Sequence, residues 1–270
     1  MVLPTGINKA VGLSAALAEL GLSVHNVAGI GDAENDHTFL RACGCAATVA
    51  NALPIVKDGA DLTLASECGA GVAELMEIIC REDARIIPRE RYGLMVGCFA
   101  DGHKAFIEPY HNGVLISGSS GIGKSTLATA LIERVAEKGL GFCVFDPEGD
   151  YSELENAVSF GDAKTPPRID QAIDLLIKAH INVAIDTESL SPTERPAFFA
   201  NLLPRLCSLR TRTGRPHWLI IDEAHHLMPA RRKDLPQVLP EEIPATVFIT
   251  VHPEEVSSDV LKRVDVVLAP

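Results

Sequence analysis

The sequence predicts an α/β protein with two three-layer α/β/α domains, in residues 1–82 and 113–270, joined by a linker and a β-hairpin in residues 83–112. Apolar strand patterns alternate with helical patterns in both domains, which favours parallel sheets with helices on their faces. A Gly-rich loop between an apolar strand and a helix supports this prediction for the second domain. The length of 270 residues suffices for two modest hydrophobic cores.

The first domain begins with a helical pattern, and strands and helices then alternate. Helical patterns cover residues 10–20, 36–42 and 71–80, and strand patterns cover residues 24–30, 46–49 and 62–64. The charged stretch CREDARIIPRERYG follows and is interpreted as the linker. The next stretch, LMVGCFADGHKAFIEP, predicts a hairpin, because Asp101-Gly102 between two apolar runs is a strong turn signal.

The second domain resumes the alternation after residue 112. Strand patterns cover residues 114–117, 141–146, 182–186, 218–222, 246–251 and 264–268. The helical patterns between them include residues 124–138, 197–211 and 256–263. No internal repeat relates the two domains.

Composition limits the classes of partner. The formal net charge of −12 disfavours wrapping of nucleic acid by bulk electrostatics, although a local basic stripe on one face would still permit a contact. Seven cysteines without framework spacing favour free thiols in a reducing compartment. The first residues do not have the pattern of a secretory signal, and no apolar run reaches the roughly 18 residues of a membrane span. We therefore expect a cytoplasmic protein with no membrane segment.

The stretch GVLISGSSGIGKSTLATALIERV contains the pattern G-x-x-x-x-G-K-S between an apolar strand and an amphipathic helix. Its glycines let backbone N–H groups face one anion, and the helix N-terminus adds partial positive charge. Lys124 is expected to contact the phosphates of ATP, and Ser125 to bind the bridging Mg²⁺. A Gly- and Ser-rich turn without a ligand is the alternative. The predicted ATP-binding residues are Gly118, Ser119, Ser120, Gly121, Ile122, Gly123, Lys124, Ser125 and Thr126.

The stretch HWLIIDEAHHLMP predicts a buried strand that ends in two carboxylates. Carboxyl ends of parallel strands meet at one edge of a sheet, where the phosphate loop also lies. Asp222 is expected to hold Mg²⁺, and Glu223 to act as the base that polarises the attacking water. A solvated strand end is the alternative for this pair taken alone.

Two further strands end in polar side chains at the same predicted edge. Thr250 and His252 follow the strand in ATVFITVHP, and either is a candidate sensor of the γ-phosphate or the water. Asp146 and Glu148 in FDPEGDY are candidates to support the site. A polar strand terminus before a proline explains the first pair equally well, and a capped turn explains the second.

The phosphate loop, DPEGDY, IIDEAHHLMP and the preceding hairpin together resemble the HerA/FtsK-type P-loop ATPases, over about the last 180 residues. The resemblance implies a P-loop NTPase domain that assembles into oligomeric rings, commonly hexamers, sometimes with an arginine supplied in trans. RLCSLRTRTGR and ARRKD contain candidates for that arginine or for a phosphate-contacting face, and a solvated helix surface is the alternative. Family members often have Gln near the position of His252, so the sensor assignment stays open, as does DNA as a partner.

The segment GDAEND follows the predicted strand 24–30, and VANA and GVAELM follow it. With Lys9 ahead, these motifs resemble the C-terminal half of a Cof-type haloacid dehalogenase (HAD) superfamily phosphatase, over about the first 80 residues. The resemblance implies an incomplete HAD-like (Rossmann-like) segment in which Asp32 ligates Mg²⁺, with Asn35 and Asp36 supporting that loop. Lys9 is implied to stabilise charge on a phospho-enzyme, and Asn51 to lie near the site. A capped helix start is the alternative for the loop alone.

The nucleophile motif DxDGT of that family is absent from the sequence. Asp32 and Lys9 therefore cannot run the phosphatase reaction alone. Either the motif lies on another part of a longer protein, or the segment is degenerate and kept for packing. The predicted function is Mg-dependent ATP hydrolysis. The alternatives are phosphatase action on a phosphorylated small molecule in a longer parent, with the P-loop domain as a regulator, and a nucleotide switch that controls assembly.

Overall fold

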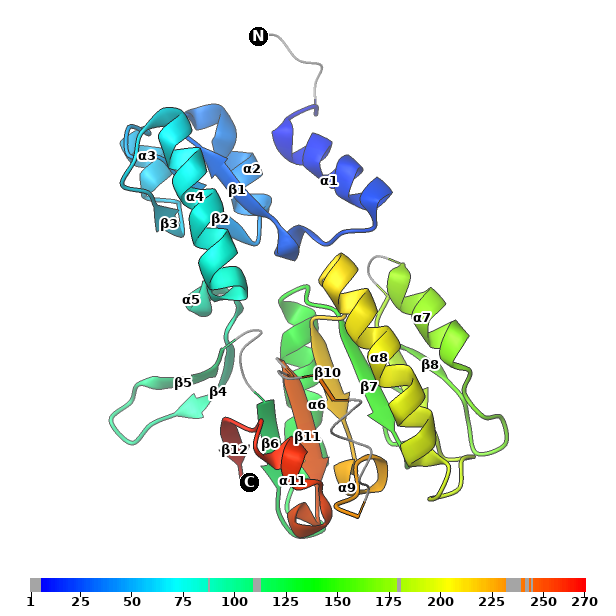
Figure 1. Ribbon diagram of the computed structural model, residues 1–270. Helices are drawn as coiled ribbons and strands as arrows, with labels where there is room; N and C mark the ends of the chain where they lie inside the picture. The colour runs from blue at the N-terminus through cyan, green and yellow to red at the C-terminus, as the bar shows by residue number, and fades with distance from the viewer. Residues whose placement is uncertain are drawn as a thin grey trace. The chain divides into compact units, whose positions relative to one another are not determined.

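The computed structural model in Figure 1 describes residues 6–86, 88–108, 113–178, 181–231, 239–240, 243 and 245–270. The chain forms two compact units, Met1–Tyr92 and Gly93–Pro270. The segment predicted as linker and hairpin is divided between them, so that the hairpin lies in the second unit. The predicted α/β class with parallel sheets is confirmed.

The first unit contains a three-stranded parallel sheet in the order β1-β2-β3. Its strands are β1 (Ala28–Gly31), β2 (Cys45–Thr48) and β3 (Leu62–Thr63). Its longer helices are α1 (Lys9–Leu20), α2 (His37–Ala42) and α4 (Cys68–Glu82), and α3 (Pro54–Lys57) is a single turn. Helices lie on both faces, since β2 directs Ala47 toward Leu75 of α4 and Ala46 toward Leu40 of α2.

The predicted strand at residues 24–30 was too long. Val24–Asn26 form a 3₁₀ turn, and β1 begins only at Ala28. The side chain of Ser23 accepts a hydrogen bond from the backbone N–H of His25 at 3.3 Å, which caps the turn. A local side-chain acceptor therefore competes successfully with strand pairing here.

The charged stretch after α4 is helical and bonded to the first unit. It forms a 3₁₀ turn, Asp83–Ile86, and α5 (Arg89–Tyr92). Arg91 donates hydrogen bonds to Asp61 Oδ2 at 3.0 Å and to the carbonyl of Arg41 at 2.6 Å.

The predicted hairpin is confirmed, with β4 (Leu94–Cys98) antiparallel to β5 (Lys104–Ile107). Its connection spans residues 99–103, and Gly102 has φ 87°, a conformation that favours glycine. Asp101 Oδ1 accepts a hydrogen bond from the backbone N–H of His103 at 3.0 Å. Arg134 donates a hydrogen bond to the carbonyl of Met95, which ties the hairpin to a helix of the second unit.

The second unit is built on a seven-stranded sheet in the order β12-β6-β11-β10-β7-β9-β8, with every pair parallel. Its strands are β6 (Gly113–Ser117), β7 (Phe142–Asp146), β8 (Val158–Phe160), β9 (Val183–Asp186), β10 (Trp218–Ile221), β11 (Thr246–Thr250) and β12 (Val266–Leu268). Its helices are α6 (Lys124–Glu137), α7 (Ile169–Ile177), α8 (Arg195–Thr213), α9 (Ala224–Leu227) and α11 (Ser258–Leu261). Strand β8 and helix α7 were not predicted. The helix predicted at residues 256–263 is shorter, because Ser257 caps its start.

Alternate residues of the central strands face two helical layers. One face, with Phe145 and Ile221, packs against α7 and α8, which lie side by side across the sheet (Figure 1). The intervening residues Val144 and Ile220 are equally buried, on the opposite face. Helix α6 contacts β6 and β7 and buries Leu131, Ile132 and Val135 outside the first core.

The register of the sheet brings four strand ends to one edge. Ser117 pairs with Thr250, and Ile221 pairs with both Phe248 and Phe145. The residues that follow these positions therefore emerge together at the carboxyl edge.

No helix in the described residues has the length and apolarity required to cross a membrane. All seven cysteines are free. The redox compartment and location therefore stay predictions.

Phe199→Ala is predicted to destabilise the second unit by about 3–5 kcal/mol, because a large core side chain is replaced by a cavity. The Phe199 ring is fully buried and packs edge-on against Phe145 with 5.0 Å between centroids. Urea denaturation followed by the fluorescence of Trp218, the single tryptophan, measures the loss. Phe99→Ala is the control, since Phe99 is 62% exposed and its removal should cost within about 0.5 kcal/mol. Equal losses for both variants would contradict the assigned core.

Candidate functional site

The loop between β6 and α6 has the backbone that its glycines predict. Gly121 and Gly123 have φ angles of 78° and 105°, which other residues adopt only with strain. A Cβ added at Gly118 would lie 2.9 Å from the side chain of Ile122. The chain therefore curls tightly between the strand end and Lys124, the first residue of α6.

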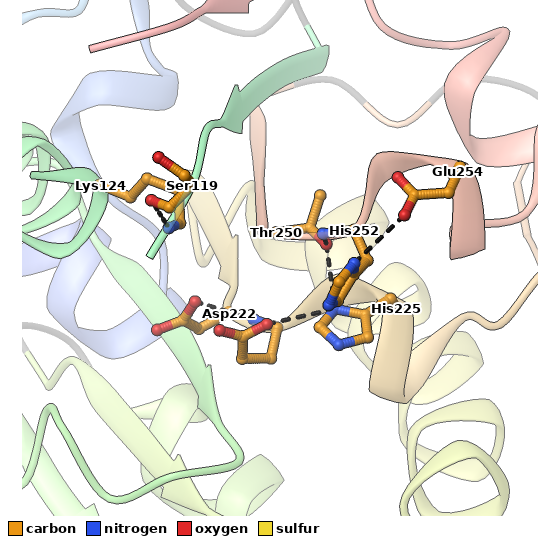
Figure 2. Close-up of polar contacts among 8 residues, drawn as sticks. Ser119, Lys124, Asp222, His225, Thr250, His252 and Glu254 are labelled. Carbon is orange, nitrogen blue, oxygen red and sulfur yellow. Dashed lines mark hydrogen bonds and ion pairs between the residues drawn. The ribbon is translucent and has the colours of Figure 1, made fainter. Parts of the chain in front are cut away.

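Lys124 is 7% exposed, and its Nζ donates a hydrogen bond to the carbonyl of Ser119 at 3.0 Å. The ammonium thus lies across the loop that it follows, as Figure 2 shows. Ser125 and Thr126, the next residues of α6, are exposed. The loop presents a fixed positive charge and a helix N-terminus to the solvent side of the sheet edge, which suits an anion.

Asp222 directly follows β10 and is 6% exposed. Its Oδ1 accepts a hydrogen bond from the backbone N–H of Glu223 at 2.8 Å. Burial raises the pKa of Asp222 to about 6, and the charges of Asp146 and Asp150 act in the same direction. A divalent cation at this carboxylate would stabilise its ionised form. An oxygen donor of this kind fits Mg²⁺.

Glu223 lies in the left-handed region of backbone conformation, with φ 42° and ψ 52°. Such strain in a residue other than glycine is typical of functional positions. Burial raises the pKa of Glu223 to about 7, and the charges of Asp222 and Glu148 add to that increase, whereas Lys124 and His252 oppose it. A base with a pKa near neutrality accepts and releases protons efficiently at that pH.

Strand β11 lies between β6 and β10 and places Thr250 beside this pair. Thr250 is fully buried, and its hydroxyl lies 2.9 Å from Nδ1 of His225 and accepts a hydrogen bond from the backbone N–H of His252 at 3.0 Å. The side chain of His252 is half-exposed, and its Nδ1 lies 3.1 Å from Glu254 Oε1 (Figure 2). The choice of sensor stays a prediction: the Thr250 hydroxyl lies at hydrogen-bond distance from His225, and the His252 ring packs edge-on against His225 with 5.3 Å between centroids.

Asp146 caps a turn. Its Oδ1 accepts hydrogen bonds from the N–H groups of Glu148, Gly149 and Asp150 at 2.8–3.3 Å, and its Oδ2 accepts one from Tyr151 at 2.9 Å. These bonds occupy both carboxylate oxygens, which favours the capped-turn interpretation over a metal ligand. The charge of Glu148 raises the pKa of Glu223, so Glu148 lies near the site.

Two residues near the site were missed from the sequence. His225 is 8% exposed and contacts both Thr250 and Glu223. The buried hydroxyl of Tyr151 lies beside Asp222, and burial together with that charge raises the pKa of Tyr151. The pattern DEAHH contains His225, but sequence spacing alone does not show which of its two histidines faces the strand.

The arginines of RLCSLRTRTGR make bonds within the second unit. Arg205 pairs with Asp170 at 2.7 Å, and Arg215, 6% exposed, donates to the carbonyls of Ile177 and Lys178. These contacts favour a structural role for Arg205 and Arg215. Most of the ARRKD segment lies outside the described residues.

The acidic loop of the first unit is organised by Asp36. Lys9 forms an ion pair with Asp36 Oδ1, and Oδ2 accepts hydrogen bonds from the backbone N–H groups of Asp32 and Ala33 at 3.2 and 3.3 Å. Burial alone would raise the pKa of Asp36, but the hydrogen bonds from Lys9 and the loop hold it below its usual value. Both carboxylate oxygens of Asp36 are therefore bonded, one to Lys9 and the other to the loop backbone.

The remaining predicted residues surround this loop less closely. Asp32 and Asn35 are exposed, so their oxygen atoms are accessible. Asn51 accepts a hydrogen bond from the backbone N–H of Cys68 at 3.0 Å, which ties the VANA turn to α4. Within the described residues, no group of three or more His, Cys, Asp or Glu side chains has the arrangement of a metal site. Metal binding by Asp32, Asn35 and Asp36 stays a prediction, and the contacts of Asp36 favour its loop-supporting role.

Two family models match the chain. Residues 1–76 match haloacid dehalogenase-like hydrolases, and residues 110–225 match the central domain of the helicase HerA. Both predicted resemblances are confirmed by these matches.

Curated relatives of the chain include two phosphatases. A phosphoglycolate phosphatase of Methanothermobacter thermautotrophicus is 40% identical over 68 residues, which cover 25% of this chain and 31% of that protein. Phosphoglycolate phosphatase 2 of Saccharolobus solfataricus is 35% identical over 79 residues, which cover 29% and 34%. The chain thus spans about a third of the length of these relatives.

Solved structures match both units. A haloacid dehalogenase-like hydrolase from Bacteroides thetaiotaomicron is 36% identical to this chain. That match covers 28% of this chain and 29% of the other, with a TM-score of 0.27. The genome packaging NTPase B204 from Sulfolobus turreted icosahedral virus 2, in complex with ATP-gammaS, is 16% identical. That match covers 58% of this chain and 73% of the other, with a TM-score of 0.42.

Asp36→Asn is predicted to destabilise the first unit by about 1–3 kcal/mol at neutral pH, because it removes a charge that accepts several hydrogen bonds. Since the folded pKa of Asp36 is depressed, its contribution is present above the unfolded pKa and disappears as pH falls through the folded pKa. Hydrogen exchange of the amides in β1 and α2 measures the change. Asp32→Asn, at an exposed side chain, is the control and should leave exchange unchanged. Equal protection in the Asp36 variant and the wild type would contradict this role.

Proposed function

We propose that the second unit binds Mg-ATP and hydrolyses it. The observation that carries the proposal is the meeting of the Lys124 loop with Glu223 at one sheet edge, where Lys124 lies close enough to affect the pKa of Glu223. A buried cation can stabilise the charge of a phosphoryl group, the Glu223 carboxylate can accept a proton from water, and Asp222 is a second carboxylate beside them. The match of residues 110–225 to the HerA central domain supports the same proposal.

In this proposal separate residues bind the phosphates, bind the metal and accept the proton. The N–H groups of residues 118–123 and the Lys124 ammonium bind the β- and γ-phosphates and neutralise charge that develops on them. Ser125 and Asp222 would hold Mg²⁺, which supplies further neutralisation when bound. Glu223 accepts the proton of the attacking water.

Ring assembly and DNA are proposed partners only by resemblance to the HerA/FtsK-type ATPases. The net charge of −12 makes any DNA contact a local one. DNA-stimulated ATP turnover that falls steeply with added salt would support this partner, and turnover indifferent to DNA would oppose it. Molar mass measured by light scattering, with and without an ATP analogue, tests the hexamer.

A second candidate function rests on the first unit. The Lys9–Asp36 ion pair and the match of residues 1–76 to haloacid dehalogenase-like hydrolases support phosphatase action on a phosphorylated small molecule in a longer protein. In that case the second unit would serve as a nucleotide-binding regulator. The reaction requires an aspartate nucleophile that the 270 residues do not supply in a DxDGT-like motif.

Glu223→Gln is predicted to lower ATP turnover by about 10²–10⁴-fold, the usual contribution of a general base, while the affinity for ATP is retained. Steady-state phosphate release and calorimetric titration with a non-hydrolysable ATP analogue separate the two effects. Glu133→Gln is the control, because Glu133 is an exposed residue of α6 more than two turns from the phosphate loop. Lys124→Ala should instead weaken ATP binding. Full turnover in Glu223→Gln would exclude this base.

Hydrolysis of p-nitrophenyl phosphate by this chain is predicted to be absent, because Asp32 and Lys9 lack a partner nucleophile. A chain extended by a segment that carries a DxDGT motif should acquire the activity, and Lys9→Met should then remove it. Activity of the 270-residue chain that survives Lys9→Met would contradict the proposed role of this site.

A further inference from the structure

His225 occupies a position between the proposed base and the neighbouring strand. Helix α9 begins directly after Glu223, and its first turn directs the His225 ring toward the end of β11 (Figure 2). The ring is held from its sides by His226, with 4.1 Å between centroids, and by His252, edge-on at 5.3 Å. His225 therefore has little freedom to rotate.

One ring nitrogen of His225 has two neighbours. Nδ1 lies 2.9 Å from the hydroxyl of Thr250, with the geometry of a hydrogen bond. The same Nδ1 lies 3.1 Å from Oε2 of Glu223. That second contact lacks hydrogen-bond alignment, and Oε2 is buried with no hydrogen-bond partner among the described residues. In this structure Nδ1 thus bonds to Thr250 and not to Glu223.

The chemistry of imidazole allows only one of these bonds to be a donation from Nδ1. Burial lowers the pKa of His225 to about 4, with the nearby His226 and His252 acting in the same direction, so the ring is neutral at pH 7. A neutral imidazole carries one proton, on Nδ1 or on Nε2. When the Thr250 hydroxyl donates to Nδ1, Nδ1 carries no proton and cannot donate to Glu223. When Nδ1 carries the proton, the carboxylate of Glu223 is the stronger acceptor.

We propose that His225 is a positioning residue that couples the hydrogen bonding of Thr250 to the orientation of Glu223. The inference rests on the proposed ATPase function. When the Thr250 hydroxyl donates to an anionic oxygen of a bound triphosphate, it no longer donates to Nδ1. The ring then gives its Nε2 proton to one water molecule and takes a proton at Nδ1 from another, so both the ring and the solvent keep their net charge. Nδ1–H donates to Glu223 and holds its carboxylate in one orientation.

The His225 ring fills space in addition to forming hydrogen bonds, and two variants at this position separate these two contributions. Leucine fills space without a polar atom, whereas the side-chain amide of asparagine can place a donor where Nδ1 lies. His225→Leu should therefore lose the hydrogen bond from residue 225 to Glu223, and His225→Asn should keep it, because the asparagine amide donates from the position of Nδ1. His103→Asn is the control, since His103 lies in the exposed turn of the hairpin and its ion-pair contact is with Asp101.

The test measures kcat, KM and the affinity for a non-hydrolysable ATP analogue. His225→Leu is expected to lower kcat about 10–100-fold, as for the loss of one hydrogen bond to a charged group, with affinity unchanged within about twofold. Thr250→Val removes the hydroxyl that competes for Nδ1, so the His225 proton should lie on Nδ1 in that variant without nucleotide, whereas in the wild type it should lie there only with the ATP analogue bound. The ¹⁵N chemical shifts of the His225 ring measure the position of this proton. His225→Asn and His103→Asn should stay within about threefold of the wild type.

The outcomes are distinguishable. Wild-type protein that neither binds nor hydrolyses ATP overturns the proposed function. Wild-type turnover that persists in His225→Leu, or an equal loss of kcat in His225→Leu and His225→Asn, overturns the role of His225 alone. If His225→Leu fails to fold, the ¹⁵N shifts of the wild-type ring decide: a His225 proton that stays on the same nitrogen with and without the ATP analogue overturns the coupling, and a move of that proton to Nδ1 supports it.

Discussion

The second unit depends on one geometric constraint, the convergence of parallel strand ends at the carboxyl edge of its sheet. Strand β11 lies between β6 and β10, so the phosphate loop after β6 and Asp222 after β10 emerge at the same edge, on either side of the end of β11. Segments about 100 residues apart in the chain meet there only because both strands pair with β11 in the same direction. Every chemical property assigned to Lys124, Glu223 and Thr250 follows from this arrangement.

Burial at that edge changes the chemistry of the acidic groups. Burial raises the pKa of Asp222 to about 6, and burial together with the charge of Asp222 raises the pKa of Glu223 to about 7. The cation of Lys124 opposes this shift. A neighbouring carboxylate, Asp146, is instead bonded to four backbone N–H groups and serves the turn that follows β7. Similar residue types at similar strand ends thus have different roles, according to their hydrogen-bond partners.

The first unit shows the same principle on a smaller scale. Asp36 gathers Lys9 and the N–H groups of its own loop, and the exposed Asp32 is left accessible. The motif order along the chain indicated a shared site for these residues. The resemblance implied that Asp36 supports the loop and that Asp32 ligates the metal, and the contacts show that Asp36 bonds to Lys9 and to two backbone N–H groups of the loop.

The sequence by itself determined the α/β class, most strands and helices, and the phosphate loop. Those features depend on local periodicity and on glycine at positive φ, as at Gly121 and Gly123, and short stretches of chain encode both. Three features were not determined by the sequence. Strand β8 is half-exposed and has only a weak apolar pattern. The 3₁₀ turn at Val24–Asn26 and the turn after Asp146 depend on hydrogen bonds that the backbone donates to side chains. Only the tertiary structure brought His225 to Thr250 and Glu223, since that contact requires the pairing of β10 with β11 and the burial that makes the ring neutral.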